Sequence, residues 1–413
     1  MTLALPHAGT APSVKRAVRR ADRPARRAAF LLSLPLLAFL AIAFVVPIAA
    51  LFTTAVDNPE TRSVLPDTLR ALAAEPSAAV PGEPVFAELA HDLARAGKAR
   101  TAALLGKRLN YEIPGMRSIV MAGSRLAAAS SQGPWRQKFC DSDPAWGDPA
   151  LWAAIRRNGA RLTPYYMLTA VDLQQTPSGG LAPVAPEQRI FLDILGRTLL
   201  VAATVTLLTL FLGYPVAYAL TLAPPLLGAI MMLCILLPLW TSLLVRTTAW
   251  VVLLQSNGII NDLLIGMGLI SKRLQLIFTR FGTVAAMTHI QLPFTILPIA
   301  SVMRTIPVAQ LRAARSLGAP PMSAFWRIYV PQTLPGVMAG CLITFILSLG
   351  YYITPALVGG PTDQMVSNFI SVYINRDLNW GLASALGVVL LAVTLLIYGL
   401  FLRIVGADKL RLG

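Results

Sequence analysis

Six long apolar runs, each flanked by polar residues, dominate the hydrophobic pattern of the chain. The first covers residues 29–55, and the other five follow a long polar region, at residues 192–222, 226–255, 281–303, 336–358 and 381–404. Each run reaches or exceeds the roughly 20 residues that an α-helix needs to cross the hydrocarbon core of a bilayer. The first is too long for the core of a signal peptide, and no clear cleavage site follows it. The pattern therefore predicts an all-α membrane protein with six transmembrane helices.

The polar region between the first two runs, residues 56–191, predicts a soluble insert between helices 1 and 2. It holds several turn signals, and residues 84–105 have a helical pattern with Leu89, Leu93 and Leu104 on one side. Its aromatic residues are Trp135, Trp146, Trp152, Tyr165 and Tyr166. A stretch of this length can build a small domain of its own. The predicted order is a basic tail (1–28), helix 1 (29–55), the insert (56–191), a helical core (192–404) and a second tail (405–413).

Composition agrees with a membrane protein and suggests its orientation. The chain of 413 residues is 55% hydrophobic and 13% charged, whereas an average soluble chain carries roughly twice that charged share. Seven basic residues and only one acid, Asp22, lie in the first tail. Residues 304–335 hold four arginines and no acid, and the second tail is also basic. By the positive-inside rule we expect both termini and the 304–335 loop to be cytoplasmic, and the insert to be outside.

One observation opposes this orientation. Lys272, Arg273 and Arg280 would then lie outside, but the three concordant signals outweigh them. Nucleic-acid binding is a weak alternative interpretation of the first tail, because the tail has no interleaved aromatic residues and an apolar run follows at once. We therefore expect a lipid bilayer, and no nucleic acid, as a partner.

The sequence offers no recognisable catalytic or cofactor motif. It lacks a Gly-x-x-x-x-Gly-Lys-Ser/Thr phosphate loop, a His-Glu-x-x-His pair and a Cys-x-x-Cys pair. Cys140, Cys234 and Cys341 are scattered and odd in number, so they predict neither a disulfide framework nor a metal site. We expect a chain that is not an enzyme and that binds no cofactor or metal.

The loop at residues 304–335 has the pattern of two short helices joined by a hinge. Pro307 can open the first helix, and Gly318 can end it in a left-handed conformation. Ala313 and Ala314 would allow close approach of another surface, and a second short helix is predicted to end at Pro331. From these residues alone, docking to another protein and lying on lipid headgroups remain equally open.

The same residues resemble the EAA loop of bacterial ABC-importer permeases. The resemblance rests on Arg312, Ala313, Ala314, Gly318, Ala319, Phe325, Ile328 and Pro331. Arg312 stands where the family has glutamate, and Val330 where it has leucine. Residues 237–250, 257–261 and 359–361 are similar to the branch of this family that serves spermidine and putrescine importers.

The resemblance implies a MetI-like permease core in the bacterial inner membrane, with a coupling loop at residues 304–335 that docks on an ATPase. It implies that ATP is hydrolysed by that partner, present in two copies, and not by this chain. The other implied partners are a second permease subunit, forming a heterodimer, and a periplasmic solute-binding protein. The implied cargo is a small molecule, a polyamine or similar organic cation.

Polar and aromatic residues within the apolar runs are candidates for the translocation path. They are Trp240, Thr241, Arg246, His289, Gln291, Tyr351 and Tyr352. Charge inside a membrane is costly and often functional, but Arg246 can also reach the outer interface, and a lone arginine would repel polyamines. His289 and Gln291 can equally bond a neighbouring helix, and the tyrosines can belong to an interfacial aromatic belt.

Two other functions remain open from the residues. The long insert would suit a membrane-anchored receptor or scaffold that works through the insert. An ion-coupled secondary transporter is disfavoured, because such proteins often carry acids inside their spans and only Asp193 comes close here.

Overall fold

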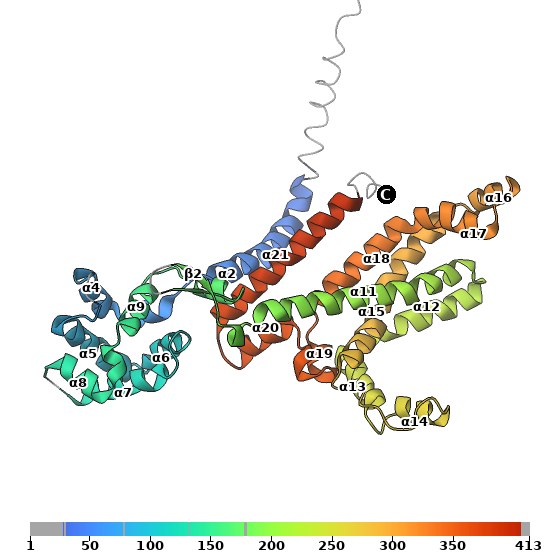
Figure 1. The fold of residues 1–413 in the computed structure, drawn as a ribbon. Helices are drawn as coiled ribbons and strands as arrows, with labels where there is room; N and C mark the ends of the chain where they lie inside the picture. Colours follow the sequence, from blue (N-terminus) through green and yellow to red (C-terminus); the bar gives the residue numbers. More distant parts are fainter. Residues whose placement is uncertain (1–27, 29, 77–78, 131, 177–179, 406–413) are drawn as a thin grey trace, which may run out of the picture. The chain divides into compact units, whose positions relative to one another are not determined.

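The computed structural model describes residues 28, 30–76, 79–130, 132–176 and 180–405 (Figure 1). The chain divides into two units, residues 1–53 and 54–413, which are described separately. The predicted basic tail, 1–28, lies almost wholly outside the described residues, as does the second tail, 405–413.

The first unit holds the first predicted span. A helix runs from Phe30 to Thr54, within a residue of each predicted end, and its mean hydropathy reaches 2.7. It contains a π-helical turn, η1 (Ala41–Val45), followed by α2 (Val46–Thr54). The wider turn comes directly before Pro47, whose ring lacks an N–H group and would clash in a regular helix.

The insert is a bundle of short helices followed by a small hairpin. Its helices are α3 (Pro59–Val64), α4 (Pro66–Ala74), α5 (Glu83–Lys98), α6 (Ala102–Asn110), α7 (Met116–Ala129), α8 (Trp135–Ser142), η2 (Pro144–Gly147), α9 (Pro149–Asn158) and α10 (Tyr165–Thr169). Strands β1 (Leu173–Gln175) and β2 (Leu181–Pro183) pair antiparallel, with Leu173 opposite Pro183, and η3 (Pro186–Gln188) follows. The sequence pattern did not predict this hairpin, because strands of three residues carry almost no periodicity.

The insert has a hydrophobic core of its own. Phe86, Phe139, Trp146 and Trp152 are buried there, with edge-to-face contacts between Phe86 and Trp152 and between Phe139 and Trp146. Leu89 and Leu93 join this core as predicted, but Leu104 is 47% exposed. Residues 84–105 are helical as predicted, except where the chain turns between α5 and α6 and Arg100 has a φ of 58°.

The rest of the chain is a helical core. It comprises α11 (Phe191–Leu222), α12 (Pro225–Trp240), α13 (Leu243–Leu254), α14 (Ile259–Gly266), α15 (Arg280–Thr305), α16 (Val308–Ser316), α17 (Pro321–Ala324), η4 (Phe325–Tyr329), α18 (Val330–Gly350), α19 (Ile353–Val358), η5 (Pro361–Asp363), α20 (Val366–Asn375) and α21 (Trp380–Val405). Helices α11, α15 and α18 make the most extensive contacts (Figure 1). Among the described residues, six segments are long and apolar enough to cross a membrane. The predicted all-α fold with six such helices is confirmed.

The third span was predicted as one continuous helix, and this is wrong. Residues 226–255 form two helices, α12 and α13, which meet at Thr241 and Ser242. The hydroxyl of Ser242 accepts a hydrogen bond from the backbone N–H of Val245, so Ser242 caps a new helix start. With only 16 residues, α12 is shorter than a full span, and the segment of spanning length begins at Leu243 and continues to Gly266 across a turn.

The predicted fifth span is wrong at both ends. The helix begins at Pro321 rather than at Gly336, continues through η4 and α18, and ends at Gly350. The short helix predicted to end at Pro331 therefore does not end there. As before Pro47, a π-helical turn (η4) precedes the proline and accommodates it without breaking the helix.

Small residues and threonines hold the three central helices together. A Cβ added at Gly336 or Gly340 of α18 would lie 2.9 Å from backbone oxygens of α15, at Pro298 and Thr295 respectively. The hydroxyl of Thr295 in α15 is within 3.0 Å of Thr209 in α11 and 2.7 Å of Thr344 in α18. Close backbone approach and interhelical hydrogen bonds are the usual means of packing helices in a membrane.

Candidate functional site

The loop at residues 304–335, which is predicted to couple to an ATPase, has a well-defined hinge at the end of α16. The N–H of Gly318 donates to the carbonyl of Arg315, and the N–H of Ala319 donates to the carbonyl of Ala314. Together with a φ of +87° at Gly318, these bonds form a Schellman motif, which ends a helix and satisfies its last carbonyl groups. The predicted stop at Gly318 agrees with this geometry, and the chain restarts at Pro321 as predicted.

An aromatic cluster fastens the second half of the loop to α11. Phe325 stacks on Tyr329 with ring centroids 5.6 Å apart, and Tyr218 of α11 meets both rings edge-on, at 5.4 and 5.5 Å. Ile328, the other predicted anchor, is half-buried, and its carbonyl accepts a hydrogen bond from Gln332. The segment that follows the hinge is therefore packed against the spanning helix α11.

The exposure of α16 differs from the expectation in one respect. Ala314, predicted to face another surface, is only 8% exposed, because its side of α16 packs towards α17 and η4. Arg312, Ala313 and Arg315 are exposed, and Leu317 at the hinge is 89% exposed. Ala319 is half-buried and Pro331 is exposed. The accessible side of α16 is thus basic with an apolar tip.

Three of the predicted path residues come together in the helical core. Arg246 of α13 lies close enough to His289 of α15 and to Tyr351, after α18, for its charge to act on both. The indole N–H of Trp250 donates to Nδ1 of His289 at 3.2 Å. Because Nδ1 accepts this bond, a neutral His289 carries its proton on Nε2. The guanidinium Nε of Arg246 is buried and has no hydrogen-bond partner within the described part of the chain.

The other predicted path residues do not join this group. Gln291 is 1% exposed, and its Oε1 accepts a hydrogen bond from Ser348 of α18 at 2.7 Å, so it bonds a neighbouring helix. Trp240 is 72% exposed and Thr241 lies at the break between α12 and α13, where its hydroxyl donates to the carbonyl of Pro238. Tyr352 is exposed before α19.

Sequence reasoning missed some residues that position this region. Trp250 orients His289, and the hydroxyls of Thr247 and Thr354 lie 3.2 Å apart and join α13 to α19. The threonines carry no distinctive sequence signal. The Gly336–Gly340 pair does, because a spacing of four places both glycines on one helix face.

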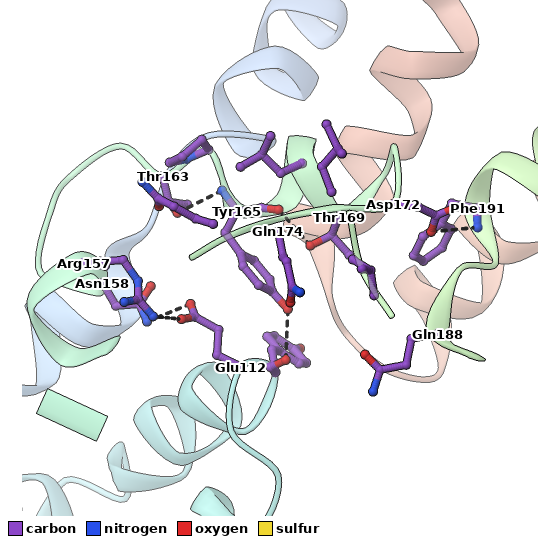
Figure 2. A pocket seen from close by; sticks show the side chains of 16 residues that line it. Glu112, Arg157, Asn158, Thr163, Tyr165, Thr169, Asp172, Gln174, Gln188 and Phe191 are labelled. Atoms are coloured by element: carbon purple, nitrogen blue, oxygen red, sulfur yellow. Dashed lines mark hydrogen bonds and ion pairs between the residues drawn. The ribbon is translucent and has the colours of Figure 1, made fainter. Parts of the chain in front are cut away.

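The insert contains a cleft of about 320 Å³ beside the start of α11 (Figure 2). Glu112, Tyr165, Asp172 and Gln174 are among the residues that line it. Glu112 is held by Arg157 and Asn158, and the carboxylate of Asp172 accepts hydrogen bonds from the first backbone N–H groups of α11. Both carboxylates are therefore satisfied by the protein and serve to join its parts.

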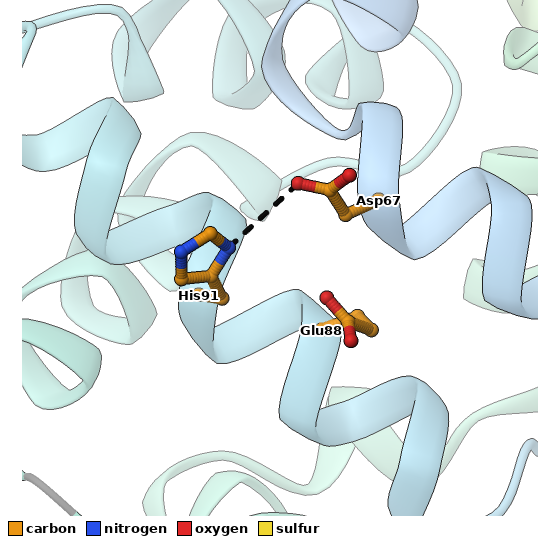
Figure 3. Close-up of side chains that lie close together, drawn as sticks. All are labelled: Asp67, Glu88 and His91. Atoms are coloured by element: carbon orange, nitrogen blue, oxygen red, sulfur yellow. Dashed lines mark ion pairs between the residues drawn. The ribbon is translucent and has the colours of Figure 1, made fainter.

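A second cluster in the insert has metal-ligating side chains. Asp67, Glu88 and His91 bring one ligand atom each within 4.8 Å of one another (Figure 3). The carboxylate of Asp67, however, pairs with Arg70 at 2.8 Å and Arg95 at 3.0 Å. Two guanidinium groups beside Asp67 disfavour a further cation, and the cluster is better described as an ion-pair network.

The chain matches a family model described as binding-protein-dependent transport system inner membrane component over residues 209–409. It is 32% identical over 212 residues to the spermidine/putrescine transport system permease protein PotB of Salmonella typhimurium, covering 51% of this chain and 74% of the relative. It is 29% identical over 281 residues to the inner membrane ABC transporter permease protein YdcU of Escherichia coli, covering 63% of this chain and 88% of the relative.

Among solved structures, the chain resembles a bacterial alginate ABC transporter in complex with an alginate-bound periplasmic protein. The TM-score is 0.43 and the identity 19%, with 55% of this chain and 81% of that chain covered.

Proposed function

Because the chain belongs to the family of binding-protein-dependent transport system inner membrane components, we propose that it forms half of the translocation path of an ATP-driven importer. It is a multi-pass inner-membrane permease of an ABC importer, and its family is a transport family and not an enzyme family. The observation that carries the proposal is the placing of α16. This helix ends at the Gly318 hinge and lies in the connection between α15 and α18, which pack against each other. A helix mounted in this way can pass movement of a docked subunit into the spans as a rigid body.

The proposed complex contains this chain, a second permease, two ATPase subunits and a periplasmic binding protein. Both termini and the coupling loop face the cytoplasm, and the insert faces the periplasm. The basic residues on the proposed outer side support this orientation, because Arg273 pairs with Asp262 and Arg280 pairs with Asp363. The four arginines of the coupling loop have no acid within the loop, which is the asymmetry that the positive-inside rule describes.

The proposed cargo is a polyamine such as spermidine or putrescine, or a similar organic cation. Its support is the similarity to PotB of Salmonella typhimurium, a spermidine/putrescine transport system permease that is 32% identical over 51% of this chain. The faces of Trp250 and Tyr351 near the outer ends of their helices are suited to organic cations. Arg246 lies near His289 and Tyr351, and we interpret it as part of the packing between α13 and α15 rather than as a cargo ligand.

The cargo is tested by uptake into proteoliposomes that contain the whole complex with ATP inside. We expect binding-protein-dependent uptake of labelled spermidine or putrescine and a matching stimulation of ATP hydrolysis. Stimulation by an unrelated solute, with no response to either polyamine, would reject the cargo while leaving the permease assignment intact.

A further inference from the structure

The accessible side of α16 carries an unusual charge for a surface that docks a protein. Arg312 and Arg315 are one helical turn apart and both are exposed. Residues 304–335 hold two more arginines, Arg304 and Arg327, and no aspartate or glutamate. Within the described residues, no carboxylate forms an ion pair with any of these four arginines. The loop therefore has a concentrated positive charge that the chain does not neutralise.

Two arginines near helix ends elsewhere in this core behave differently. Arg280, at the start of α15, has Asp363 at 2.9 Å, and Arg273 has Asp262 at 2.9 Å. The fold thus supplies carboxylates to Arg273 and Arg280 but leaves the four arginines of the coupling loop unpaired. A partner that covers Arg312 and Arg315 must supply the missing negative charge, because burying an unpaired guanidinium is costly.

The four arginines divide into two pairs by position. Arg304 lies in the last turn of the spanning helix α15, and Arg327 lies in η4, within the spanning segment Pro321–Gly350. Arg312 and Arg315 lie on α16, beyond the end of α15 (Figure 1). Next to them, Leu317 is 89% exposed at the Gly318 hinge. An apolar tip beside two cations fits a groove with a hydrophobic pocket and an acidic wall.

We propose that α16 docks into an acidic groove on the ATP-hydrolysing subunit, with carboxylates that face Arg312 and Arg315 and an apolar pocket that receives Leu317. This inference rests on the proposed function, and adds the chemistry of the partner surface to it. The pairing would also discriminate against ATPase subunits whose groove is basic.

The test uses the whole complex, purified in mild detergent through a tag on this chain. The double variant Arg312→Glu/Arg315→Glu should weaken retention of the ATPase subunit by about tenfold or more, since it replaces two attractive pairs with two repulsive ones. The variant Arg312→Lys/Arg315→Lys keeps the charge and should retain most of the ATPase subunit that the wild type retains. Retention by the wild type should fall as the salt concentration rises.

The matched control is Arg117→Glu/Arg125→Glu on α7 of the insert. Both residues are exposed and the change in net charge is identical, so retention of the ATPase should match the wild type. Replacing acidic residues of the ATPase groove with lysine should restore binding to the Arg312→Glu/Arg315→Glu chain, which a merely misfolded variant would not allow.

Two outcomes separate failure of this inference from failure of the proposed function. If the wild type retains the ATPase and the double variant retains it equally, the acidic groove is wrong. If retention instead follows the content of phosphatidylglycerol in nanodiscs, the arginines serve the lipid surface, which also overturns the inference. If the wild type itself retains no ATPase, the proposed function fails before this inference is reached.

Discussion

At Gly318 the backbone takes a φ of +87°, a conformation that costs an L-residue about 1–2 kcal/mol. The pattern of alanines, glycine and prolines predicted this hinge correctly, because each residue type acts through its own backbone geometry. Exposure was harder to predict. Ala313 and Ala314 are identical as residues, yet only Ala314 is buried, because its side of α16 faces α17 and η4.

Gly318→Pro is expected to uncouple ATP hydrolysis from transport while leaving the protein inserted in the membrane. Proline fixes φ near −65° and removes the N–H that donates to Arg315, so the hinge cannot form. Gly318→Asn is the control, since asparagine tolerates the left-handed conformation better than most residues. Solute uptake and ATPase rate are measured in proteoliposomes, and transport unchanged by proline would show that the hinge is not the coupling element.

The ion pairs of Asp67 make a prediction about pH. Hydrogen bonding from Arg95, with the nearby charge of Arg70, holds the pKa of Asp67 below its ordinary value of 3.8. An acid with a lowered pKa contributes stability that is present above its unfolded pKa and is lost as the pH falls through its folded pKa. We therefore expect the wild type to be more stable than Asp67→Asn near neutral pH, and this difference to vanish in strong acid.

Tryptophan fluorescence of the detergent-solubilised protein can follow this transition, because Trp146 and Trp152 lie in the core of the insert. Burial raises the pKa of the neighbouring Asp92, and the charge of Asp67 raises it further, so the difference between wild type and Asp67→Asn also contains the change at Asp92. A stability difference that stays constant down to strong acid would mean that the Asp67 pairs contribute nothing.

At the scale of the helices, the lengths of the apolar runs predicted the number of spans. The hydrophobic pattern did not predict where the helices inside those runs are broken. The breaks at Thr241 and Tyr351 lie inside runs that are apolar on both sides, so periodicity gives no sign of them. Conversely, Pro331 was predicted to end a helix, but the π-helical turn η4 before it lets the helix continue. Membrane helices tolerate such irregularities when neighbouring helices or local widening of the turn satisfy the backbone.

Gly340→Ala tests the packing of α18 against α15. The added Cβ would lie 2.9 Å from the carbonyl oxygen of Thr295, so the helices must separate, at an expected cost of about 1–3 kcal/mol. Gly196→Ala in α11 is the control, because nothing lies within 4 Å of its Cβ position. Thermal unfolding in detergent should show a lower midpoint for Gly340→Ala only. Equal midpoints would contradict close packing at this position.

At the scale of the whole second unit, the insert contacts the connection between α20 and α21. The ammonium group of Lys107 donates to the backbone carbonyls of Asp377 and Leu378, and burial lowers the pKa of this lysine. A Cβ at Gly381 would lie 2.4 Å from the ring of Tyr166. The contacts of Lys107 join residues about 270 positions apart in the sequence, and Tyr166 is also distant from Gly381, so no local pattern could have predicted them.

Gly381→Ala is expected to loosen this contact, because its methyl group would displace the ring of Tyr166. Hydrogen exchange of residues 376–381 should become faster in the variant. Gly399→Ala, in the same helix but with nothing within 4 Å of its Cβ, should leave exchange unchanged. If exchange at 376–381 were unaffected by Gly381→Ala, the insert would not stabilise this connection.

The central claim is that this chain is the membrane half of an ATP-driven importer, and purification of the tagged chain from native membranes in mild detergent tests it most directly. The account predicts that an ATPase subunit and a second permease co-elute and that the eluate hydrolyses ATP. A chain that elutes alone, without ATPase activity under any detergent condition that keeps it folded, would contradict the account and favour a receptor acting through its insert.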